Sequence, residues 1–410
     1  MICGLLGKKL SHSYSPQIHG MLGDYPYLLF EKDESEVEYF LKNGNFHGLN
    51  VTIPYKKTVL PYCAELSPEA EKLGAVNTII RRTDGTLMGH NTDYFGFLSM
   101  AKHSGLSFNQ KKVLVLGSGG ASNTVCAVLQ ELGAQVTVIS RTGKNNYDNL
   151  HLHNDCKIIV NTTPVGMYPN NGNSPVDLSL FPHLEGVLDL IYNPFKTKLI
   201  QDAEVRGLVT ENGLWMLVAQ AKEASEWFTG TKISDNLIPF IHRKLTNSMK
   251  NLVLIGMPGC GKSTVGQILA SQTGRQYADA DQYICQKAGC TIPEIFKAKG
   301  EAYFRTLETE VLAELSKRSG LILATGGGCV TREENLPLLQ QNGTIIWIQR
   351  SIDTLATNGR PLSQSTNLQE MYRIRKPLYQ KFSDMEIRND GTPEETAQNI
   401  LSLLNKENTL

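Results

Sequence analysis

The 410-residue sequence has no excess charge of either sign, because 40 Lys and Arg residues balance 40 Asp and Glu residues. Neither sign dominates a long segment, so nothing favours binding to nucleic acid or to a membrane surface. No apolar run approaches the length of a membrane-spanning helix, and the N-terminal stretch MICGLLGKKLSHS lacks the apolar core of a signal peptide. These absences predict a soluble, cytoplasmic protein.

The sequence also lacks cysteines at the spacings of metal-binding or redox motifs. The eight cysteines are scattered, without Cys-x-x-Cys pairs or Cys/His clusters at zinc spacing, which indicates free thiols in a reducing compartment. His151 and His153 lie close together but have no further ligand partners, so we interpret their stretch as a solvated loop and predict no metal there. Internal repeats and low-complexity segments are absent as well.

Apolar strand-like runs alternate with helical patterns along the whole chain, which is typical of α/β folds with parallel sheets. The runs lie at residues 49–53, 76–80, 113–116, 136–139, 158–160, 187–191, 252–255, 321–324 and 345–348. The length favours about two to three domains. We interpret a helical stretch at 93–105 as a hinge and the short polar sequence TNSMK at 246–250 as a close tether. The predicted parts are a catalytic domain at 1–100 with returning helices at about 211–247, a Rossmann-type domain at 101–210, and a P-loop domain at 249–410.

The most specific motif is a Walker A phosphate loop, GMPGCGKST at residues 256–264. It follows the apolar run 251–255 and leads into a helical pattern, which is the context that the motif requires. Its glycines let backbone N–H groups surround phosphates, Lys262 reaches the β- and γ-phosphates, and the Ser263 hydroxyl can bind Mg²⁺. We therefore predict an ATP and Mg²⁺ site whose nucleotide-binding residues are Gly259, Cys260, Gly261, Lys262, Ser263 and Thr264.

A second glycine turn, GSGGAS at residues 117–122, lies between a predicted strand and a predicted helix. Its glycines match the first two positions of the dinucleotide-binding fingerprint, whereas Ser122 occupies the third. After the next strand the chain has Arg141 and lacks the carboxylate that would bind the ribose hydroxyls of NAD. A guanidinium at this place suits the 2′-phosphate of NADP. The predicted NADP-binding residues are Gly117, Gly119, Gly120, Ala121, Ser140, Arg141 and Thr142.

The N-terminal part resembles the shikimate dehydrogenase family through LSHSYSP, NVTIPYK, LGAVNT, GHNTD, GSGGAS, NTTPVGM and GLWMLVAQA. The resemblance implies that Lys56 and Asp93 are the catalytic pair. A lysine ammonium can protonate the alkoxide that hydride transfer leaves, and a carboxylate can position that lysine; Asp93 is also a candidate helix N-cap. The resemblance further implies carboxylate binding by Ser13 and Ser15, hydroxyl binding by Asn50, Thr52, Asn77 and Gln220, and positions near substrate or nicotinamide for Tyr192, Gly213 and Met216.

One departure from the dehydrogenase pattern follows Arg141. Only the polar stretch TGKNNYDNLHLHNDCK separates it from Ile158, where a full crossover helix is expected. We therefore predict a trimmed cofactor domain with one short turn of helix at this place.

From Met249 onward the chain resembles the shikimate kinase family through GMPGCGKST, ADADQYI, GEAYFRTLE, ATGGGCV, GRPL and RIRKPLY. Asp279 and Asp281 follow a predicted strand, and on an extended segment both side chains would point the same way. The resemblance implies that Asp279 lies on the Mg²⁺ side and that Asp281 faces the acceptor hydroxyl.

The same resemblance assigns the substrate side of the kinase half. Forked guanidinium donors suit carboxylates, and Arg305 and Arg375 match the family's carboxylate-binding arginines. Arg360 resembles the lid arginine that reaches the transferring phosphate. The glycine turn that lets the backbone approach the ring hydroxyls is matched by Gly326, Gly327 and Gly328. The lid stretch RSIDTLATNG is shorter than the family's and lacks its arginine over the nucleotide base.

Together the resemblances imply a bifunctional enzyme that reduces 3-dehydroshikimate with NADPH and then phosphorylates shikimate with ATP and Mg²⁺. Its partners would be these small molecules, without nucleic acid or membrane, and a homodimer is left open. One alternative is a dehydrogenase with a degenerate, regulatory ATP-binding module, which the short lid motivates. Another is an NAD-dependent quinate/shikimate dehydrogenase joined to a kinase for a different polyol. Arg141 argues against NAD, and the pair Arg305 and Arg375 argues against a substrate without a carboxylate.

Overall fold

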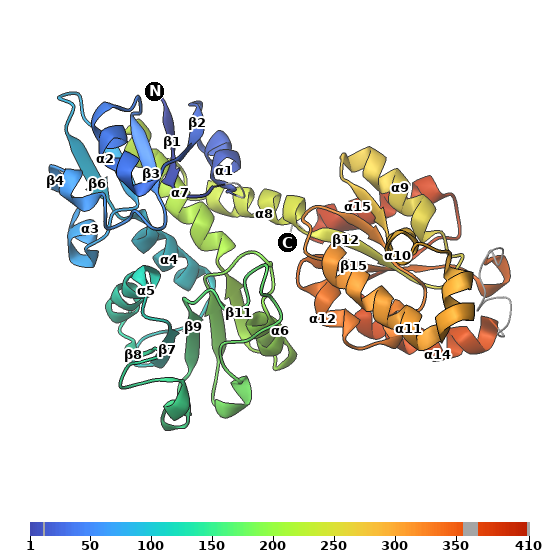
Figure 1. Cartoon of the computed structure of the whole chain (residues 1–410). Helices are drawn as coiled ribbons and strands as arrows, with labels where there is room; N and C mark the ends of the chain where they lie inside the picture. The colour runs from blue at the N-terminus through green and yellow to red at the C-terminus, as the bar shows by residue number, and fades with distance from the viewer. Residues whose placement is uncertain (11–12, 356–367, 408–410) are drawn as a thin grey trace. The chain divides into compact units, whose positions relative to one another are not determined.

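The computed structural model describes residues 1–10, 13–355 and 368–407 (Figure 1). The chain divides into two compact units, one made of Met1–Tyr192 and Leu199–Lys244, the other of Asn193–Lys198 and Leu245–Leu410. Within the described residues, no helix combines the length and apolar character needed to cross a bilayer.

The first sheet of the first unit is mixed, with the strand order β2-β1-β3-β5-β6-β4. Strands β1, β2 and β3 are parallel, but β5 runs antiparallel to both β3 and β6. The expectation of parallel sheets is therefore wrong here, because the short turn at 82–86 between β5 and β6 forms a hairpin and leaves no room for a crossover. The strands are β1 (Cys3–Gly7), β2 (Tyr27–Glu31), β3 (Gly48–Val51), β4 (Glu65–Leu66), β5 (Thr78–Arg81) and β6 (Leu87–His90).

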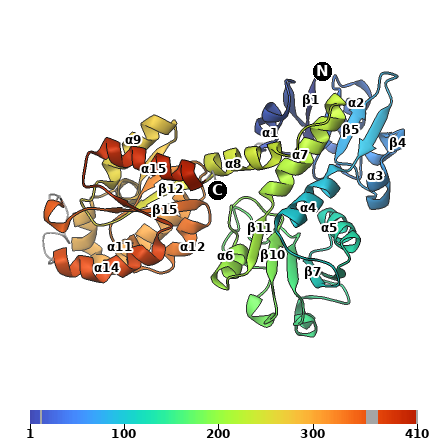
Figure 2. The same ribbon diagram turned by 180° about the vertical axis from the view of Figure 1, so that it is seen from behind.

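Two helices pack closely beside this sheet, α4 (Thr92–His103) and α7 (Leu214–Thr229), as both views show (Figure 1, Figure 2). A Cβ at Gly96 would lie 2.8 Å from the Met216 carbonyl oxygen, so glycine permits this close approach. The helix predicted at 93–105 is confirmed as α4. The other helices of this part are α1 (Ser15–Leu22), α2 (Glu34–Asn43), α3 (Pro68–Leu73) and the 3-10 turn η1 (Leu60–Tyr62).

The second sheet is entirely parallel, in the order β11-β10-β9-β7-β8. Its register pairs Leu116 with Ile139 and with Asn161, so the carboxyl ends of the strands share one edge. Only the 3-10 segment η2 (Tyr147–His153) connects β8 to β9, which confirms the trimmed crossover. The elements are β7 (Lys112–Leu116), α5 (Gly120–Glu131), β8 (Gln135–Ile139), β9 (Ile158–Asn161), η3 (Leu178–Leu180), β10 (Gly186–Asp189), α6 (Lys198–Val205) and β11 (Val209–Asn212).

The sheet of the second unit is also parallel, in the order β13-β14-β12-β15-β16. Helices α9 and α15 cover one face, and α11, α12 and α14 cover the other (Figure 1). Its strands are β12 (Asn251–Ile255), β13 (Tyr277–Asp279), β14 (Ile322–Ala324), β15 (Gly343–Gln349) and β16 (Met385–Arg388). Its helices are α9 (Lys262–Thr273), α10 (Ala280–Ala288), α11 (Ile292–Leu315), η4 (Cys329–Thr331), α12 (Asn335–Gln340), η5 (Ile352–Thr354), α14 (Leu368–Phe382) and α15 (Pro393–Glu407).

The predicted tether at 246–250 is not a separate loop. Helix α8 (Leu237–Met249) runs through this sequence, and β12 begins at Asn251. The polar residues are therefore the last turn of a helix, and a single residue separates that helix from the next strand.

Candidate active sites

The first unit brings Lys56 and Asp93 together. Lys56 follows β3, Asp93 lies in the first turn of α4, and the ammonium Nζ is 2.5 Å from the carboxylate Oδ2. The two side chains are 32% and 17% exposed, so both reach a surface that solvent or a ligand can contact. The N-cap of α4 is Asn91, so the alternative that Asp93 caps this helix is wrong.

Three of the four residues predicted to bind ring hydroxyls, Asn50, Asn77 and Gln220, belong to one hydrogen-bonded network. Asn50 Nδ2 donates to Thr78 Oγ1 at 3.1 Å, and Thr78 Oγ1 donates to Asn77 Oδ1 at 3.2 Å. Asn77 Oδ1 also accepts from the Thr92 backbone N–H at 2.7 Å, and Thr92 Oγ1 donates to Gln220 Oε1 at 3.4 Å. Sequence reasoning missed the two threonines, although both lie inside the motifs LGAVNT and GHNTD.

The other predicted substrate residues lie in two places. The Ser15 backbone N–H donates to Ser13 Oγ at 3.2 Å, and the ring of Tyr14 between them meets the Tyr192 ring edge to face at 6.2 Å. Burial raises the pKa of Tyr192 above its ordinary value. Thr52 directly follows β3, where its N–H donates to the Leu6 carbonyl at 2.9 Å.

The predicted cofactor residues lie at the carboxyl edge of the second sheet. Gly117 has φ +103°, and a Cβ there would lie 2.9 Å from Thr162 Oγ1, so the turn requires glycine. Gly119 is the N-cap of α5, and Gly120 and Ala121 begin that helix. Because Leu116 pairs with Ile139, this turn lies beside the segment after β8 that holds Ser140, Arg141 and Thr142. Arg141 is exposed there.

Gly213 and Met216 lie where β11 passes into α7. Gly213 is the N-cap of α7, and a Cβ at this position would lie 2.0 Å from the Leu190 carbonyl oxygen. Only glycine therefore fits between the end of β10 and the start of α7. Met216 follows in the first turn of the helix, on the side that packs against Gly96.

The second unit contains a cavity of about 360 Å³ around the Walker loop. Most of the predicted kinase residues line it: Gly259, Gly261, Lys262, Ser263, Thr264, Asp279, Asp281, Arg305, Gly326, Gly327, Gly328 and Arg375. Cys260 is fully buried and does not line the cavity. Arg360 lies outside the described residues, as do residues 356–359 of the predicted lid stretch.

The Walker loop has the backbone that its glycines permit, with φ +84° at Gly259 and +100° at Gly261. Lys262 Nζ donates to the carbonyl oxygens of Gly256 and Met257 at 2.8 and 3.0 Å, which holds the ammonium inside the loop. Ser263 Oγ donates to Asp279 Oδ2 at 2.8 Å, so the two predicted Mg²⁺ ligands are adjacent.

The two aspartates do not share an extended segment, so that expectation is wrong. Asp279 ends β13 and caps α10, accepting from the Asp281 N–H at 3.0 Å, whereas Asp281 lies in the first turn of the helix. Both side chains still line the cavity. Burial, together with Asp279 and Glu308, raises the pKa of Asp281 to about 6.

The buried arginines are held by different partners. Arg305 Nη1 donates to Glu308 Oε2 at 2.7 Å, and a Cβ at Gly328 would lie 2.2 Å from the Arg305 guanidinium. Arg375 Nη1 donates to the Gly327 carbonyl oxygen at 3.1 Å. Glu308 is fully buried and was missed by sequence reasoning, although it stands three residues after Arg305, which is one helical turn.

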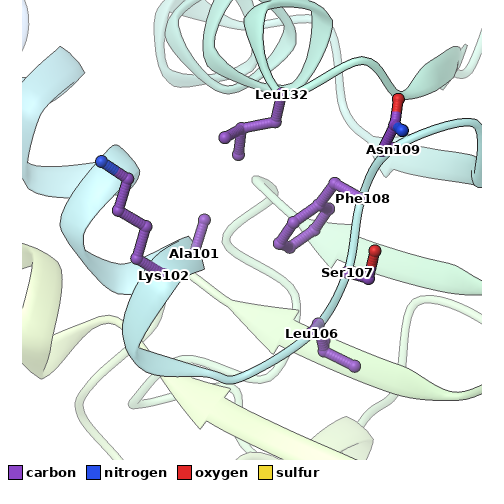
Figure 3. A pocket seen from close by; sticks show the side chains of 7 residues that line it. All are labelled: Ala101, Lys102, Leu106, Ser107, Phe108, Asn109 and Leu132. Carbon is purple, nitrogen blue, oxygen red and sulfur yellow. The ribbon is translucent and has the colours of Figure 1, made fainter.

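A second cavity, of about 180 Å³, lies where α4 ends and β7 approaches (Figure 3). Leu132, Phe108 and Ala101 point into it, and the Lys102 ammonium points away (Figure 3). Because apolar side chains point into it and its one charged group points away, we assign no reaction to it. It is lined by Ala101, Lys102, Leu106, Ser107, Phe108, Asn109 and Leu132.

Comparison with known proteins identifies the family of the chain. The chain is 34% identical over 264 residues to a shikimate dehydrogenase (NADP⁺) of Clostridium perfringens, covering 59% of this chain and 97% of that protein. The chain belongs to the shikimate dehydrogenase family. The model of the family's substrate binding domain matches residues 5–79, and the shikimate kinase model matches residues 258–405. A shikimate kinase domain therefore follows the shikimate dehydrogenase part on the same chain.

Solved structures of the dehydrogenase family are similar to the first part of the chain. Shikimate dehydrogenase 1 from Peptoclostridium difficile is 38% identical, with a TM-score of 0.55, covering 60% of this chain and 97% of that one. The Thermus thermophilus enzyme in complex with NADP(H) and shikimate is 30% identical, also with a TM-score of 0.55, covering 60% of this chain and 99% of that one.

The glycine turn after β7 fits a dinucleotide phosphate. A Cβ at Gly119 or Gly120 would meet no heavy atom within 4 Å, so the backbone at the start of α5 is open to a ligand. Helix N-termini attract anions through their free N–H groups and dipole. No carboxylate follows β8, and the exposed Arg141 offers a cation for the 2′-phosphate of NADP.

The second unit likewise fits ATP with Mg²⁺. The Walker loop borders the cavity, Lys262 is 8% exposed within it, and the Ser263 hydroxyl and Asp279 carboxylate supply adjacent oxygen ligands. Asp281 Oδ1 and Glu308 Oε1 are buried without a hydrogen-bond partner among the described residues. These acceptors face Gly326, so a hydroxyl donor entering the cavity there would satisfy them.

Proposed function

We propose that the chain reduces 3-dehydroshikimate to shikimate with NADPH and then phosphorylates the 3-hydroxyl of shikimate with ATP. The observation that carries the proposal is the presence, on one chain, of the Lys56–Asp93 pair and of a Walker-loop cavity with two buried arginines. The product of the first reaction is the substrate of the second, so each assignment supports the other.

In the dehydrogenase half, NADPH supplies the hydride. The network of Asn50, Asn77 and Gln220 binds the ring hydroxyls, and Ser13 and Ser15 bind the carboxylate. Lys56 gives its proton to the oxygen that becomes the new hydroxyl, and Asp93, at 2.5 Å, keeps the ammonium in place for that transfer. In the reverse direction the neutral amine takes the proton back.

In the kinase half, ATP with Mg²⁺ supplies the phosphoryl group. Arg305 and Arg375 bind the carboxylate and so orient the ring. Asp281 accepts the proton of the attacking hydroxyl, and a pKa near 6 suits a base that works near neutral pH. Lys262 places positive charge beside the Walker loop, where phosphate charge develops. Arg360 is proposed to add a lid cation.

The proposal is tested by product analysis by mass. The purified chain is incubated with 3-dehydroshikimate, NADPH, ATP and Mg²⁺. Shikimate 3-phosphate is the expected product. Shikimate that accumulates without phosphorylation would support the regulatory alternative for the kinase domain, and no conversion would overturn the dehydrogenase assignment. Replacing NADPH with NADH in parallel tests the cofactor, which we propose to be NADP.

We also propose a reducing, cytoplasmic location. All eight cysteines are described and none forms a disulfide, including the partly exposed Cys63, Cys126, Cys285 and Cys290. Titration of free thiols on the protein isolated from its source cells tests this proposal, and oxidised cysteines would contradict it.

A further inference from the structure

Tyr27 lies behind the hydroxyl-binding network of the dehydrogenase half. It begins the edge strand β2, and its hydroxyl donates to Asn50 Oδ1 at 2.7 Å. Burial raises the pKa of Tyr27 well above its ordinary value, and a hydrogen bond with the Ser15 hydroxyl opposes that shift. One phenol group thus contacts two residues that we propose to bind substrate, one for the hydroxyls and one for the carboxylate.

The Tyr27 ring rests on a buried histidine. It stacks on His19 with the centroids 4.0 Å apart and the planes 9° from parallel. His19 is fully buried, and burial lowers its pKa to about 3, opposed in part by the Asn50 side chain. The imidazole is therefore neutral at physiological pH and stacks as an uncharged ring.

The His19 ring is itself fixed to α7. Its Nδ1 is 2.8 Å from the Tyr25 hydroxyl, which donates to Ser225 Oγ at 2.7 Å. Since the Tyr25 proton points to Ser225, the Tyr25 oxygen accepts from Nδ1–H. The elements that carry His19, Tyr27 and Ser225, which are α1, β2 and α7, lie side by side (Figure 1). These two hydrogen bonds connect the stack under Tyr27 to α7.

This arrangement determines what the Asn50 amide presents to a ligand. Its oxygen accepts from Tyr27, and its nitrogen donates to Thr78, so partners within the protein hold both ends of the amide. An amide held on only one side can rotate by 180° and exchange its donor with its acceptor. We infer that Tyr27, supported by the His19 stack, is a positioning residue that fixes the orientation of the Asn50 amide for substrate binding. This inference rests on the proposed dehydrogenase function.

The test compares Tyr27→Phe with Tyr62→Phe in the full chain. Both variants remove one phenol hydroxyl from the first unit, but Tyr27 bonds Asn50, whereas Tyr62 bonds the exposed Glu38 side chain. The assay follows shikimate oxidation with NADP⁺. Losing one hydrogen bond that orients a ligand-binding group should raise the KM for shikimate about three- to tenfold in Tyr27→Phe, with kcat within about twofold. In Tyr62→Phe the KM should stay within about twofold of the wild-type value.

A double variant shows whether Tyr27 acts through Asn50. Asn50→Ala should raise the KM, and adding Tyr27→Phe to it should raise the KM further by less than Tyr27→Phe does alone. An unchanged KM in Tyr27→Phe, an equal rise in Tyr62→Phe, or fully additive effects in the double variant would each overturn the inference. A wild-type chain that does not oxidise shikimate would instead overturn the proposed function and the inference with it.

Discussion

The Lys56 ammonium lies 2.5 Å from the Asp93 carboxylate, although the two residues are 37 positions apart in the chain. Lys56 comes from the turn after β3 and Asp93 from the first turn of α4, so the fold of the first sheet creates this pair. The neighbouring Lys57 is exposed and makes no ion pair among those identified in the described residues. Of these two adjacent lysines, Lys56 is therefore the one with a carboxylate partner among the described residues.

Lys56→Met should lower the kcat of shikimate oxidation by about 10²- to 10⁴-fold, which is the usual contribution of a general acid or base. Asp93→Asn should also lower kcat, because the amide holds the ammonium less firmly. Lys57→Met is the matched control and should keep the wild-type rate. Shikimate-dependent ADP formation should be unchanged in all three variants, and a loss of that activity would indicate misfolding instead.

Arg141→Ala should weaken NADPH binding. A charged hydrogen bond contributes about 1.5–3 kcal/mol, so the KM for NADPH should rise about 10- to 100-fold. The rate with NADH should not fall, because NADH lacks the 2′-phosphate that the guanidinium would contact. Lys144→Ala removes another exposed cation from the same segment and serves as the control. If both variants raise the KM equally, the effect is general electrostatic attraction and not recognition by Arg141.

Arg375→Met should impair the kinase reaction on the shikimate side. Arg375 is 7% exposed and lines the cavity, whereas Arg373, two residues away on α14, has a side chain 74% exposed and pairs with Glu370. We expect the KM for shikimate to rise about 10- to 100-fold in Arg375→Met and the KM for ATP to change little. Arg373→Met should behave as wild type. A larger change in the KM for ATP would place Arg375 on the nucleotide side.

Contiguous motifs were predicted from the sequence because their chemistry depends on local backbone. The Walker loop and the turn after β7 need glycines at particular φ angles, and Gly117, Gly259 and Gly261 have positive φ as expected. The parallel second and third sheets also follow from alternation along the chain. The first sheet was not predicted, because the pattern of apolar runs does not show that β5 turns back on β6.

Residues that act through tertiary contacts were missed. Thr78 and Thr92 connect the hydroxyl-binding residues only once β5 and α4 meet, and Tyr27 lies on an edge strand far from the recognisable motifs. The backbone conformation of the D-x-D motif at Asp279 and Asp281 was predicted wrongly for a different reason. A spacing of two residues fits an extended segment, but the Asp279 carboxylate caps α10 and so starts a helix between the two aspartates.

Because of the buried His90, we expect the first unit to lose stability as the pH falls. It ends β6, is 2% exposed, and stacks on Trp227 at 3.7 Å, with no hydrogen-bond partner for either ring nitrogen in the described chain. Burial is the main cause that lowers the pKa of His90 from 6.5 to about 4. Between about pH 6.5 and pH 4, the His90 imidazole carries a proton in the unfolded chain but not in the folded chain. The free energy of unfolding should therefore fall as the pH drops from about 6.5 to 4.

His90→Phe keeps an aromatic ring against Trp227 but cannot titrate. The free energy of unfolding, measured with urea at several pH values, should then depend less steeply on pH in this window. The slope should correspond to up to about one proton fewer taken up on unfolding. Some slope should remain, because burial also lowers the pKa of His19, to about 3. His183→Phe changes an exposed histidine and should leave the slope as in the wild type. An unchanged slope in His90→Phe would mean that another group takes up the proton in this pH window.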